Sequence, residues 1–225
     1  MQSKKIPDEQ HWYGQEPVAM LLIKKVKKDA CILEMGIGKG GVVKRLLRKQ
    51  PNLNIVGFDI KANSLKIARS FFKKNCKGKY TIFKSSQDIN LVTKFGKNKF
   101  DFVISAGVLD YAKEPDNVIK NVKKILKSGG YFAFTLFDNF SSSDYDGKSP
   151  RQRYISKSGI KTWGYRETYI KKLLKKINLR LCSISLFKGL HKCKLSELSH
   201  SEIQAVKENR DSHYEDHFVI LARKN

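Results

Sequence analysis

Two short apolar runs of the sequence each end in an acidic residue, Glu34 and Asp59. Glycines at every second position follow the first run, at Gly36, Gly38 and Gly40, and an amphipathic stretch comes next. Glycines in such a turn let backbone amides approach a ligand, and a helix start adds unpaired donors. Because a carboxylate at the mouth of this cradle repels a bare pyrophosphate, the pattern favours a ligand with hydroxyls and a cationic group.

Two further polar positions extend this candidate site. Asp59 lies about twenty residues beyond the glycines, where a nucleotide-binding βαβ unit places the carboxylate that binds a ribose. A chance acid at a strand end is the plainer alternative. Asp88 follows a third apolar run and could bind a purine edge together with its neighbour Ile89. Alternatively, Ser86 or Asp88 is an ordinary helix N-cap, since both are preferred capping residues.

The elements that must position these residues alternate regularly along the chain. Apolar runs with strand character alternate with amphipathic helices, which is typical of a doubly wound, mostly parallel sheet with helices on both faces. We expect strands at 30–34, 54–59, 80–83, 100–105, 131–136, 180–187 and 217–222, and helices at 17–28, 40–49, 63–74, 115–127 and 166–177. Ser128-Gly129-Gly130 is expected to end the helix before it. The last two strands lack a crossover helix, so we expect an antiparallel pair at one edge of a seven-stranded sheet.

The length of 225 residues fits one α/β domain. We expect an N-terminal helical lid over 1–28, a cofactor-binding core over 29–138, and a substrate-side part over 139–225. Residues 139–165 are polar with scattered aromatics and are expected to form an irregular insert. Aromatic and basic residues that could shape a pocket are Trp12, Tyr13, Tyr145, Arg153 and Tyr154, although Trp12 and Tyr13 could equally pack the first helix.

The net charge of +24 raises the possibility of a nucleic-acid partner. The excess is mostly lysine and is spread over every predicted helix, so a lysine-rich composition explains it equally well. No apolar run reaches the ~18 residues of a membrane span, and residues 1–11 lack the apolar core of a signal peptide. Four cysteines without a CxxC pair favour a cytoplasmic protein with reduced thiols. His191, Cys193 and His200 match no standard metal spacing, so no metal is expected.

The chain resembles the class I S-adenosylmethionine-dependent methyltransferases over roughly residues 17–138, and more loosely over its end. Several stretches in the right order and spacing carry this resemblance. They are Glu34-x-Gly36-x-Gly38-x-Gly40, Asp59, Ser86-Gln87-Asp88, the segment 105–111, and Leu126-Lys127-Ser128-Gly129-Gly130. Gly36-x-Gly38-x-x-Gly41 also fits the GxGxxG pattern of an NAD-dependent dehydrogenase, but Glu34 would face the pyrophosphate of that cofactor unfavourably.

The resemblance implies that S-adenosylmethionine binds here and leaves as S-adenosylhomocysteine. Glu34 and the glycine turn would hold its methionine part, Asp59 its ribose, Ile60 and Asp88 its adenine, and Ser105 would lie beside the sulfonium. The full set of implied contacts is Glu34, Gly36, Ile37, Gly38, Gly40, Asp59, Ile60, Gln87, Asp88, Ile89, Ser105 and Ala106.

The expected reaction is methyl transfer to an oxygen or nitrogen of a small molecule. Asp110 and Tyr111 lie where several small-molecule methyltransferases carry a substrate-facing residue, so they are the catalytic candidates, although the histidine found there in many of them is absent. An RNA or protein methyltransferase and a non-catalytic cofactor-binding subunit remain alternatives. No Asn/Asp-Pro-Pro-Tyr or Pro-Cys follows the fourth predicted strand, which argues against adenine amino methylation and a cytosine C5 mechanism.

Overall fold

The computed structural model describes residues 15–139, 146–155, 159, 161–187 and 216–225. Their strands form one sheet in the order β3-β2-β1-β4-β5, all parallel, with β9 antiparallel to β5 and β8 antiparallel to β9. The strands of this part are β1 (Cys31–Met35), β2 (Asn54–Asp59), β3 (Tyr80–Lys84), β4 (Phe100–Ser105), β5 (Leu126–Asp138), β8 (Leu179–Phe187) and β9 (His217–Lys224). The predicted doubly wound sheet with an antiparallel pair is confirmed.

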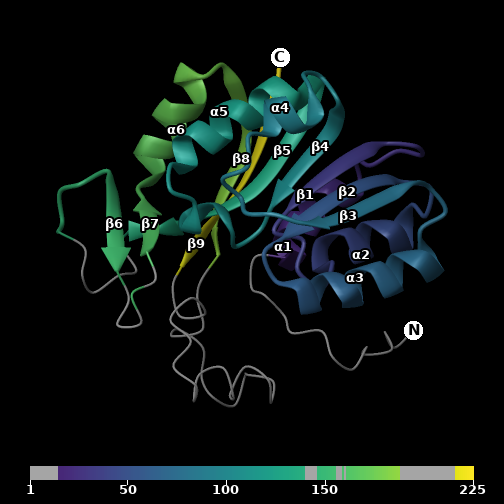
Figure 1. The fold of residues 1–225 in the computed structure, drawn as a ribbon. Helices are drawn as coiled ribbons and strands as arrows, with labels where there is room; N and C mark the ends of the chain where they lie inside the picture. The colour runs from purple at the N-terminus through teal and green to yellow at the C-terminus, as the bar shows by residue number, and fades with distance from the viewer. Residues whose placement is uncertain (1–14, 140–145, 156–158, 160, 188–215) are drawn as a thin grey trace, which may run out of the picture.

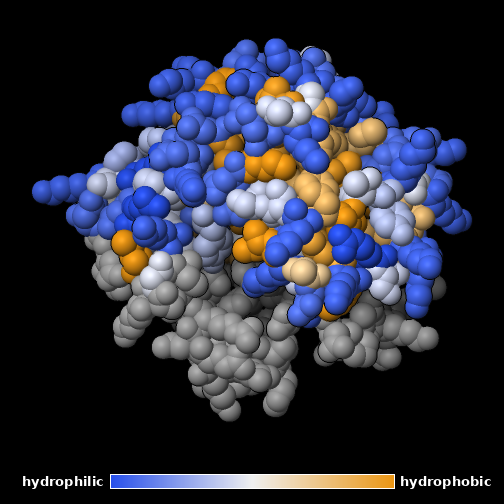
Figure 2. Space-filling view, in the orientation of Figure 1, coloured by the Kyte–Doolittle hydropathy of each residue, from blue (hydrophilic) through white to orange (hydrophobic). Residues whose placement is uncertain are grey.

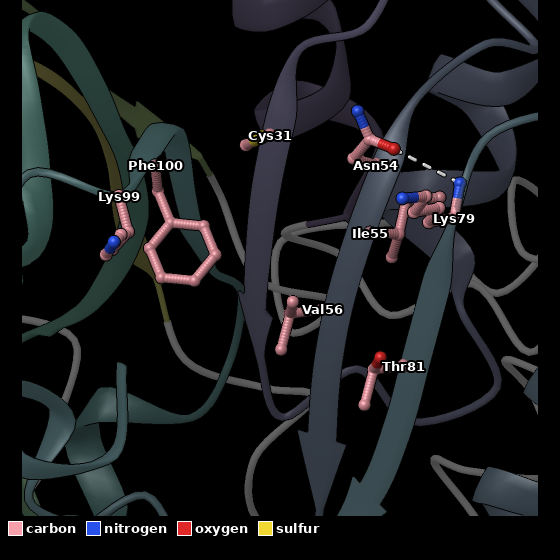
Figure 3. A pocket seen from close by; sticks show the side chains of 8 residues that line it. All are labelled: Cys31, Asn54, Ile55, Val56, Lys79, Thr81, Lys99 and Phe100. Carbon is pink, nitrogen blue, oxygen red and sulfur yellow. Dashed lines mark hydrogen bonds between the residues drawn. The ribbon is translucent and has the colours of Figure 1, made fainter. Parts of the chain in front are cut away.

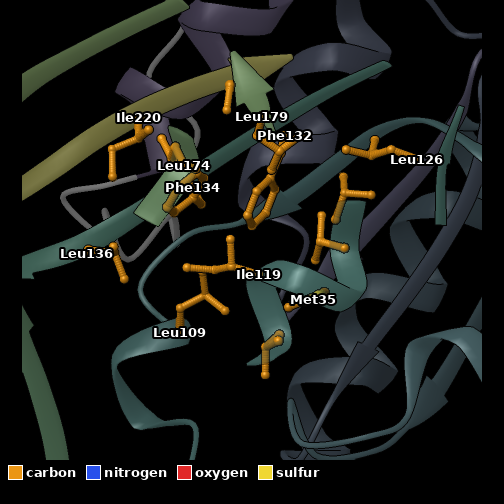
Figure 4. Packing of buried hydrophobic residues seen from close by; sticks show 14 of the residues in the cluster. Met35, Leu109, Ile119, Leu126, Phe132, Phe134, Leu136, Leu174, Leu179 and Ile220 are labelled. Atoms are coloured by element: carbon orange, nitrogen blue, oxygen red, sulfur yellow. The ribbon is translucent and has the colours of Figure 1, made fainter. Parts of the chain in front are cut away.

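Helices cover both faces of this sheet (Figure 1). One face carries α1 (Gln15–Ile23), α2 (Gly41–Lys49) and α3 (Ala62–Asn75), and the other carries α4 (Leu91–Phe95), α5 (Pro115–Ile125) and α6 (Glu167–Lys176), while η1 (Leu109–Tyr111) is one 3₁₀ turn after β4. Successive strand residues point to opposite faces, so Ile32 packs with the first helix layer while Leu33 packs with the second. Figure 4 shows the second layer, in which Phe132 and Phe134 of β5 lie near Ile119 of α5.

The sheet has nine strands rather than seven because the predicted irregular insert contains two of them. β6 (Arg151–Ile155) and β7 (Lys161–Tyr165) form an antiparallel pair, and β7 runs parallel to the end of β5 at Phe137 and Asp138. Gly164 permits this close approach, since a side chain there would collide with Asn139. In β6 only Arg153 and Ile155 are exposed and the other residues are half-buried, so the segment lacks the apolar–polar alternation that identifies a strand in sequence.

Two helix boundaries differ from the prediction. The first helix ends at Ile23 rather than residue 28, because residues 24–28 are mostly lysine and offer no continuous apolar face. The helix before β5 ends at Ile125, because Leu126 already pairs with Phe100 of β4. Ser128, Gly129 and Gly130 therefore lie in the bulged start of β5 and do not end the helix. Within the described part of the chain, no helix combines the length and apolar character needed to cross a membrane.

Candidate functional site

The glycine turn joins the carboxyl end of β1 to the start of α2. Gly36, Gly38 and Gly40 have φ values of 68°, 52° and 87°, a region that side-chain-bearing residues rarely adopt. A side chain on Gly36 would also collide with Val108 in the loop after β4. Gly40 is the N-cap of α2 and has no side chain to cap that helix, so the carboxyl group of Glu34 in β1 is the acceptor for the Val43 amide in its first turn. The amides of Ile37, Gly38 and Gly40 donate to the Phe58 carbonyl, to Oδ2 of Asp59 and to the Ile37 carbonyl, so the protein itself holds the shape of this turn at the centre of the sheet edge.

Glu34 is the buried acid at this edge. It is 2% exposed, and its Oε2 atom has no hydrogen-bond partner in the described structure. The pKa of Glu34 is raised to about 8, mainly by burial, with a hydrogen bond from the Val43 amide opposing the shift and the charge of Asp59 adding to it. A buried carboxyl oxygen without a partner costs free energy. A ligand that brings a cationic donor would remove that cost.

Asp59 ties the end of β2 to the glycine turn. Its Oδ2 accepts a hydrogen bond from the Gly38 amide at 2.9 Å, and its Oδ1 accepts one from the Lys61 amide at 2.8 Å. The carboxylate is thus fixed beside the cradle, and its charge contributes to the raised pKa of Glu34. Both acids lie at the carboxyl ends of neighbouring parallel strands, where open α/β sheets have their ligand crevice. Next to it, Ile60 is 56% exposed, although a large apolar side chain is more often buried.

The loop after β3 closes one side of this crevice. Gln87 donates from Nε2 to the Tyr111 carbonyl at 3.0 Å, and the Lys113 amide donates to Oδ1 of Asp88 at 2.9 Å. These bonds join the loops after β3 and β4. The capping alternative for Ser86 and Asp88 is wrong, because Asn90 caps α4.

Asp110 is a second buried acid, in the turn after β4. It is 2% exposed; its Oδ1 accepts a hydrogen bond from the Phe137 amide at 2.8 Å, and its Oδ2 has no partner among the described residues. Burial raises the pKa of Asp110 to about 7, while the Phe137 amide opposes the shift. Ser105 at the end of β4 is also buried, and its Oγ likewise has no partner within the described residues. Polar groups thus gather at the carboxyl ends of β1, β4 and β5.

A cluster that the sequence analysis did not identify fixes β6 and β7 beside β5. The guanidinium carbon of Arg151 lies 3.6 Å from the centroid of the Trp163 ring, and Nη1 of Arg151 is 3.3 Å from Oδ2 of Asp116 at the start of α5. The Tyr169 hydroxyl donates to the same oxygen at 2.6 Å, and the Tyr165 hydroxyl donates to Oδ1 at 3.4 Å. The alternating strand pattern of residues 161–165 was the available signal for this cluster.

Other predicted residues occupy varied positions. Ile37 was a predicted cofactor contact, but its side chain is buried in the core against Gly57. Only its backbone remains for a ligand. Ile89 and Ala106 are partly buried against the two apolar layers. Arg153 lies over the Trp163 ring at 5.3 Å, and the Tyr154 hydroxyl donates to Oδ1 of Asn139 at 3.3 Å. Trp12, Tyr13, Tyr145, His191, Cys193 and His200 lie outside the described residues.

A family model described as a methyltransferase domain matches residues 26–177, which include the glycine turn, both buried acids and the loops around them. The chain belongs to the class I S-adenosylmethionine-dependent methyltransferases. This membership removes the basis for the dehydrogenase alternative. The glycine cradle, the unpartnered Oε2 of Glu34 and the carboxylate of Asp59 fit the family's cofactor, S-adenosylmethionine, which carries an ammonium group and ribose hydroxyls.

Relatives of this methyltransferase act on different acceptors, according to their names. A malonyl-[acyl-carrier protein] O-methyltransferase of Paenibacillus is 26% identical over 106 residues, covering 47% of this chain and 38% of the relative. A tRNA N(3)-methylcytidine methyltransferase of Schizosaccharomyces pombe is 24% identical over 188 residues, covering 78% of this chain and 74% of the relative. The matches to the first three curated relatives span only 38%, 24% and 14% of their lengths.

Solved methyltransferase structures share the fold of this chain. The 1,6-didemethyltoxoflavin-N1-methyltransferase of Burkholderia thailandensis, solved with 1,6-didemethyltoxoflavin and S-adenosylhomocysteine bound, matches with a TM-score of 0.65 at 13% identity. The match covers 94% of this chain and 78% of that one.

Proposed function

We propose that this methyltransferase transfers a methyl group from S-adenosylmethionine to an oxygen or nitrogen of a small-molecule acceptor. The observation that carries the proposal is the set of buried polar atoms without partners in the described structure, Oε2 of Glu34, Oγ of Ser105 and Oδ2 of Asp110. These atoms come from the carboxyl ends of β1 and β4 and the turn after β4, where ligands bind in open α/β sheets. A few buried polar atoms in such a position suit a small ligand.

The cofactor half of this proposal assigns a role to each strand tip. Glu34 would face the ammonium of the methionine part, the backbone of the Gly36–Gly40 turn would pack against that part, and Asp59 would accept from the ribose hydroxyls. Ile60 would pack against the adenine with its exposed apolar side chain. When bound, S-adenosylmethionine supplies an activated methyl group, so the protein mainly aligns the acceptor and excludes water.

The acceptor half of this proposal centres on Asp110. A carboxyl group with a pKa of about 7 exchanges its proton near neutral pH, which is the condition for an effective general base. Its Oδ1 is held by the Phe137 amide, so Oδ2 remains for an acceptor hydroxyl or amine. Tyr111 follows it in the same turn, and Arg153 and Tyr154 of β6 would shape the acceptor pocket.

An RNA acceptor is the second candidate function. The net charge of +24 and the tRNA methyltransferase that matches 78% of this chain favour it. The two candidates differ in which fraction of a cell extract accepts the methyl group. The same experiment tests the two remaining alternatives. A protein acceptor predicts label in the protein fraction, and a purely cofactor-binding role predicts label in no fraction.

The test incubates the protein with methyl-labelled S-adenosylmethionine and with three separate extract fractions, containing small molecules, RNA and protein. Label in the small-molecule fraction supports the proposal, whereas label confined to RNA or protein refutes the acceptor class. Asp110→Asn should lower the labelling rate on the order of 10²-fold, as loss of a positioned base does, while calorimetric binding of S-adenosylhomocysteine stays unchanged. Absence of S-adenosylhomocysteine binding in the unmodified protein would refute the cofactor half as well.

A further inference from the structure

Basic side chains gather on the edge of the sheet opposite to the crevice. We call this the amino edge: the last turns of the helices, and the loops that lead into the parallel strands and β8. The last turns of α2, α3, α5 and α6 each contain two basic residues. The basic residues of the amino edge are Lys24, Lys25, Lys27, Lys28, Arg48, Lys49, Lys73, Lys74, Lys77, Lys79, Lys97, Lys99, Lys123, Lys124, Lys127, Lys175, Lys176, Arg180, Arg223 and Lys224. Asp29 and, just inside β4, Asp101 are the acids of these segments.

The sheet topology produces this gathering from residues that are widely spaced in the sequence. Strands β1 to β5 run parallel, and β8 runs in the same direction because β9 is antiparallel to both of its neighbours. Every helix that connects them therefore ends at the same edge. The C-terminus of the chain lies on this edge, at the top of Figure 1, and hydrophilic side chains dominate the surface around it in Figure 2.

Helix electrostatics account for only part of the charge. Lysine in a last helical turn interacts favourably with the helix dipole, but many lysines of the amino edge lie in loops, among them Lys27, Lys77, Lys79, Lys97 and Lys99. Lys127 forms an ion pair with Asp101 at 2.9 Å, and no other lysine of the amino edge forms one within the described residues. The charge is therefore largely uncompensated by neighbouring acids.

A hollow of about 380 Å³ opens on the amino edge, lined by Cys31, Asn54, Ile55, Val56, Lys79, Thr81, Lys99 and Phe100. Its walls are the first residues of β1, β2 and β4, so it lies away from the crevice at their other ends. Figure 3 shows Lys79 and Lys99 on opposite sides of it, with Phe100 beside Lys99 and Val56 between the two sides. A second hollow on the same edge, of about 340 Å³, is bordered by Arg180, Arg223 and Lys224.

We propose that the amino edge is a docking surface for the phosphate backbone of a nucleic acid, separate from the methyl-transfer crevice. Lysine binds phosphates as a point charge without reading sequence, and such contacts dominate nonspecific affinity. β2 and β4 have six residues each, so this surface lies about 20 Å from the crevice at ~3.3 Å per residue. A bound backbone would leave the crevice open, whatever the acceptor is.

A membrane surface fits the amino edge less well than a nucleic acid. Proteins that bind a bilayer surface insert apolar side chains beside their basic residues. The large apolar side chains that the described structure exposes are Met20, Ile60, Ile67, Ile155 and Leu186, and none belongs to the amino edge. Among the described residues, the amino edge therefore has no exposed large apolar side chain that could insert into a bilayer.

The test compares two variants with the same change in charge. Lys79 and Lys99 line the hollow, and Lys77 and Lys97 lie two residues before them in the same loops. All four are exposed, and the test variant changes each of them to Gln. The control variant changes exposed lysines elsewhere, with the substitutions Lys66→Gln, Lys120→Gln, Lys161→Gln and Lys172→Gln. Fluorescence anisotropy with a 20-base-pair RNA duplex and a DNA duplex of the same sequence gives binding constants from about 50 to 200 mM KCl. Calorimetry with S-adenosylhomocysteine verifies that both variants keep the native crevice.

The unmodified protein should bind with a steep salt dependence, and the test variant should lose at least about tenfold in affinity. Its slope of log K against log salt should become shallower by about 3, since each phosphate contact contributes about 0.9, while the control changes by less than about 1. Tighter binding of either duplex identifies the preferred nucleic acid. Equal losses in both variants, weak binding by the unmodified protein, or stronger binding to anionic lipid vesicles would overturn the proposal. In an independent measurement, the RNA duplex should protect Lys79 and Lys99, but not Lys66, from chemical acetylation.

Discussion

Replacing Glu34 by Gln should stabilise the ligand-free protein at pH 8 and weaken its binding of S-adenosylhomocysteine. Burial raises the pKa of this carboxyl from 4.5 to about 8, so between these values the folded state binds a proton that the unfolded state releases. The stability that this proton contributes is complete below pH 4.5 and is lost as the pH rises through 8. Linkage makes the loss between pH 5 and pH 8 roughly 3 kcal/mol. Gln cannot ionise, so the variant escapes this loss.

Urea unfolding of the ligand-free protein at pH 5 and pH 8 measures the effect. The gap between the two free energies of unfolding should be smaller in Glu34→Gln than in the unmodified protein by roughly 3 kcal/mol. Calorimetry should show binding of S-adenosylhomocysteine weakened about 10- to 100-fold, because a charge-assisted hydrogen bond to the ammonium contributes roughly 1.5–3 kcal/mol. A ligand-binding group that destabilises the fold links the two effects: replacing it makes the protein more stable and weakens ligand binding.

Glu167→Gln is the matched control. Glu167 forms an exposed pair with Lys171 on α6, away from the crevice. Its loss should change the free energy of unfolding by no more than about 0.5 kcal/mol and leave ligand binding unchanged. If Glu34→Gln instead destabilises the protein equally at both pH values and binds S-adenosylhomocysteine normally, Glu34 is a structural residue and our assignment of the crevice is wrong.

Three further substitutions test other parts of the site. Gly36→Ala would place a side chain against Val108 at a positive φ, so it should cost about 1–3 kcal/mol in urea unfolding and reduce S-adenosylhomocysteine binding; normal binding would contradict the cradle. Asp110→Asn should remove from the pH–rate profile the ascending limb near pH 7 that its raised pKa predicts, and an unchanged limb would exclude it as the base. Arg151→Ala leaves Asp116 without its ion pair and should cost about 1–3 kcal/mol. It should raise the KM for the acceptor while calorimetric S-adenosylhomocysteine binding is unchanged, and equal effects on both would contradict a role confined to β6 and β7.

The central fold was predictable because its signals are local. An apolar run that ends in an acid and a glycine turn identified β1, and Asp59 identified the end of β2 by the same rule. Asp138 ends β5 in the same way. The strands β6 and β7 were missed because their partners are set by tertiary contacts, such as Arg151 against Trp163, and an arginine in sequence indicates an exposed position.

The site was predictable only in outline. The sequence placed Glu34 and Asp59 at strand tips, but it could not show that Oδ2 of Asp59 binds the Gly38 amide or that Oε2 of Glu34 has no partner in the described structure. The basic charge illustrates the same limit on a larger scale. Lysines that alternate evenly with other residues along the chain give no block in sequence, and only the parallel topology brings them to one edge.

The hydrogen bond between Asp59 and the Gly38 amide has a consequence for the dynamics of ligand capture. Because this bond forms within the protein alone, the turn is already braced before any nucleoside arrives. Ordering the turn then adds little entropic cost to association. The Gly38 amide should accordingly exchange slowly with deuterated solvent even in the ligand-free protein, unlike the amides of a loop that becomes ordered only when its ligand binds.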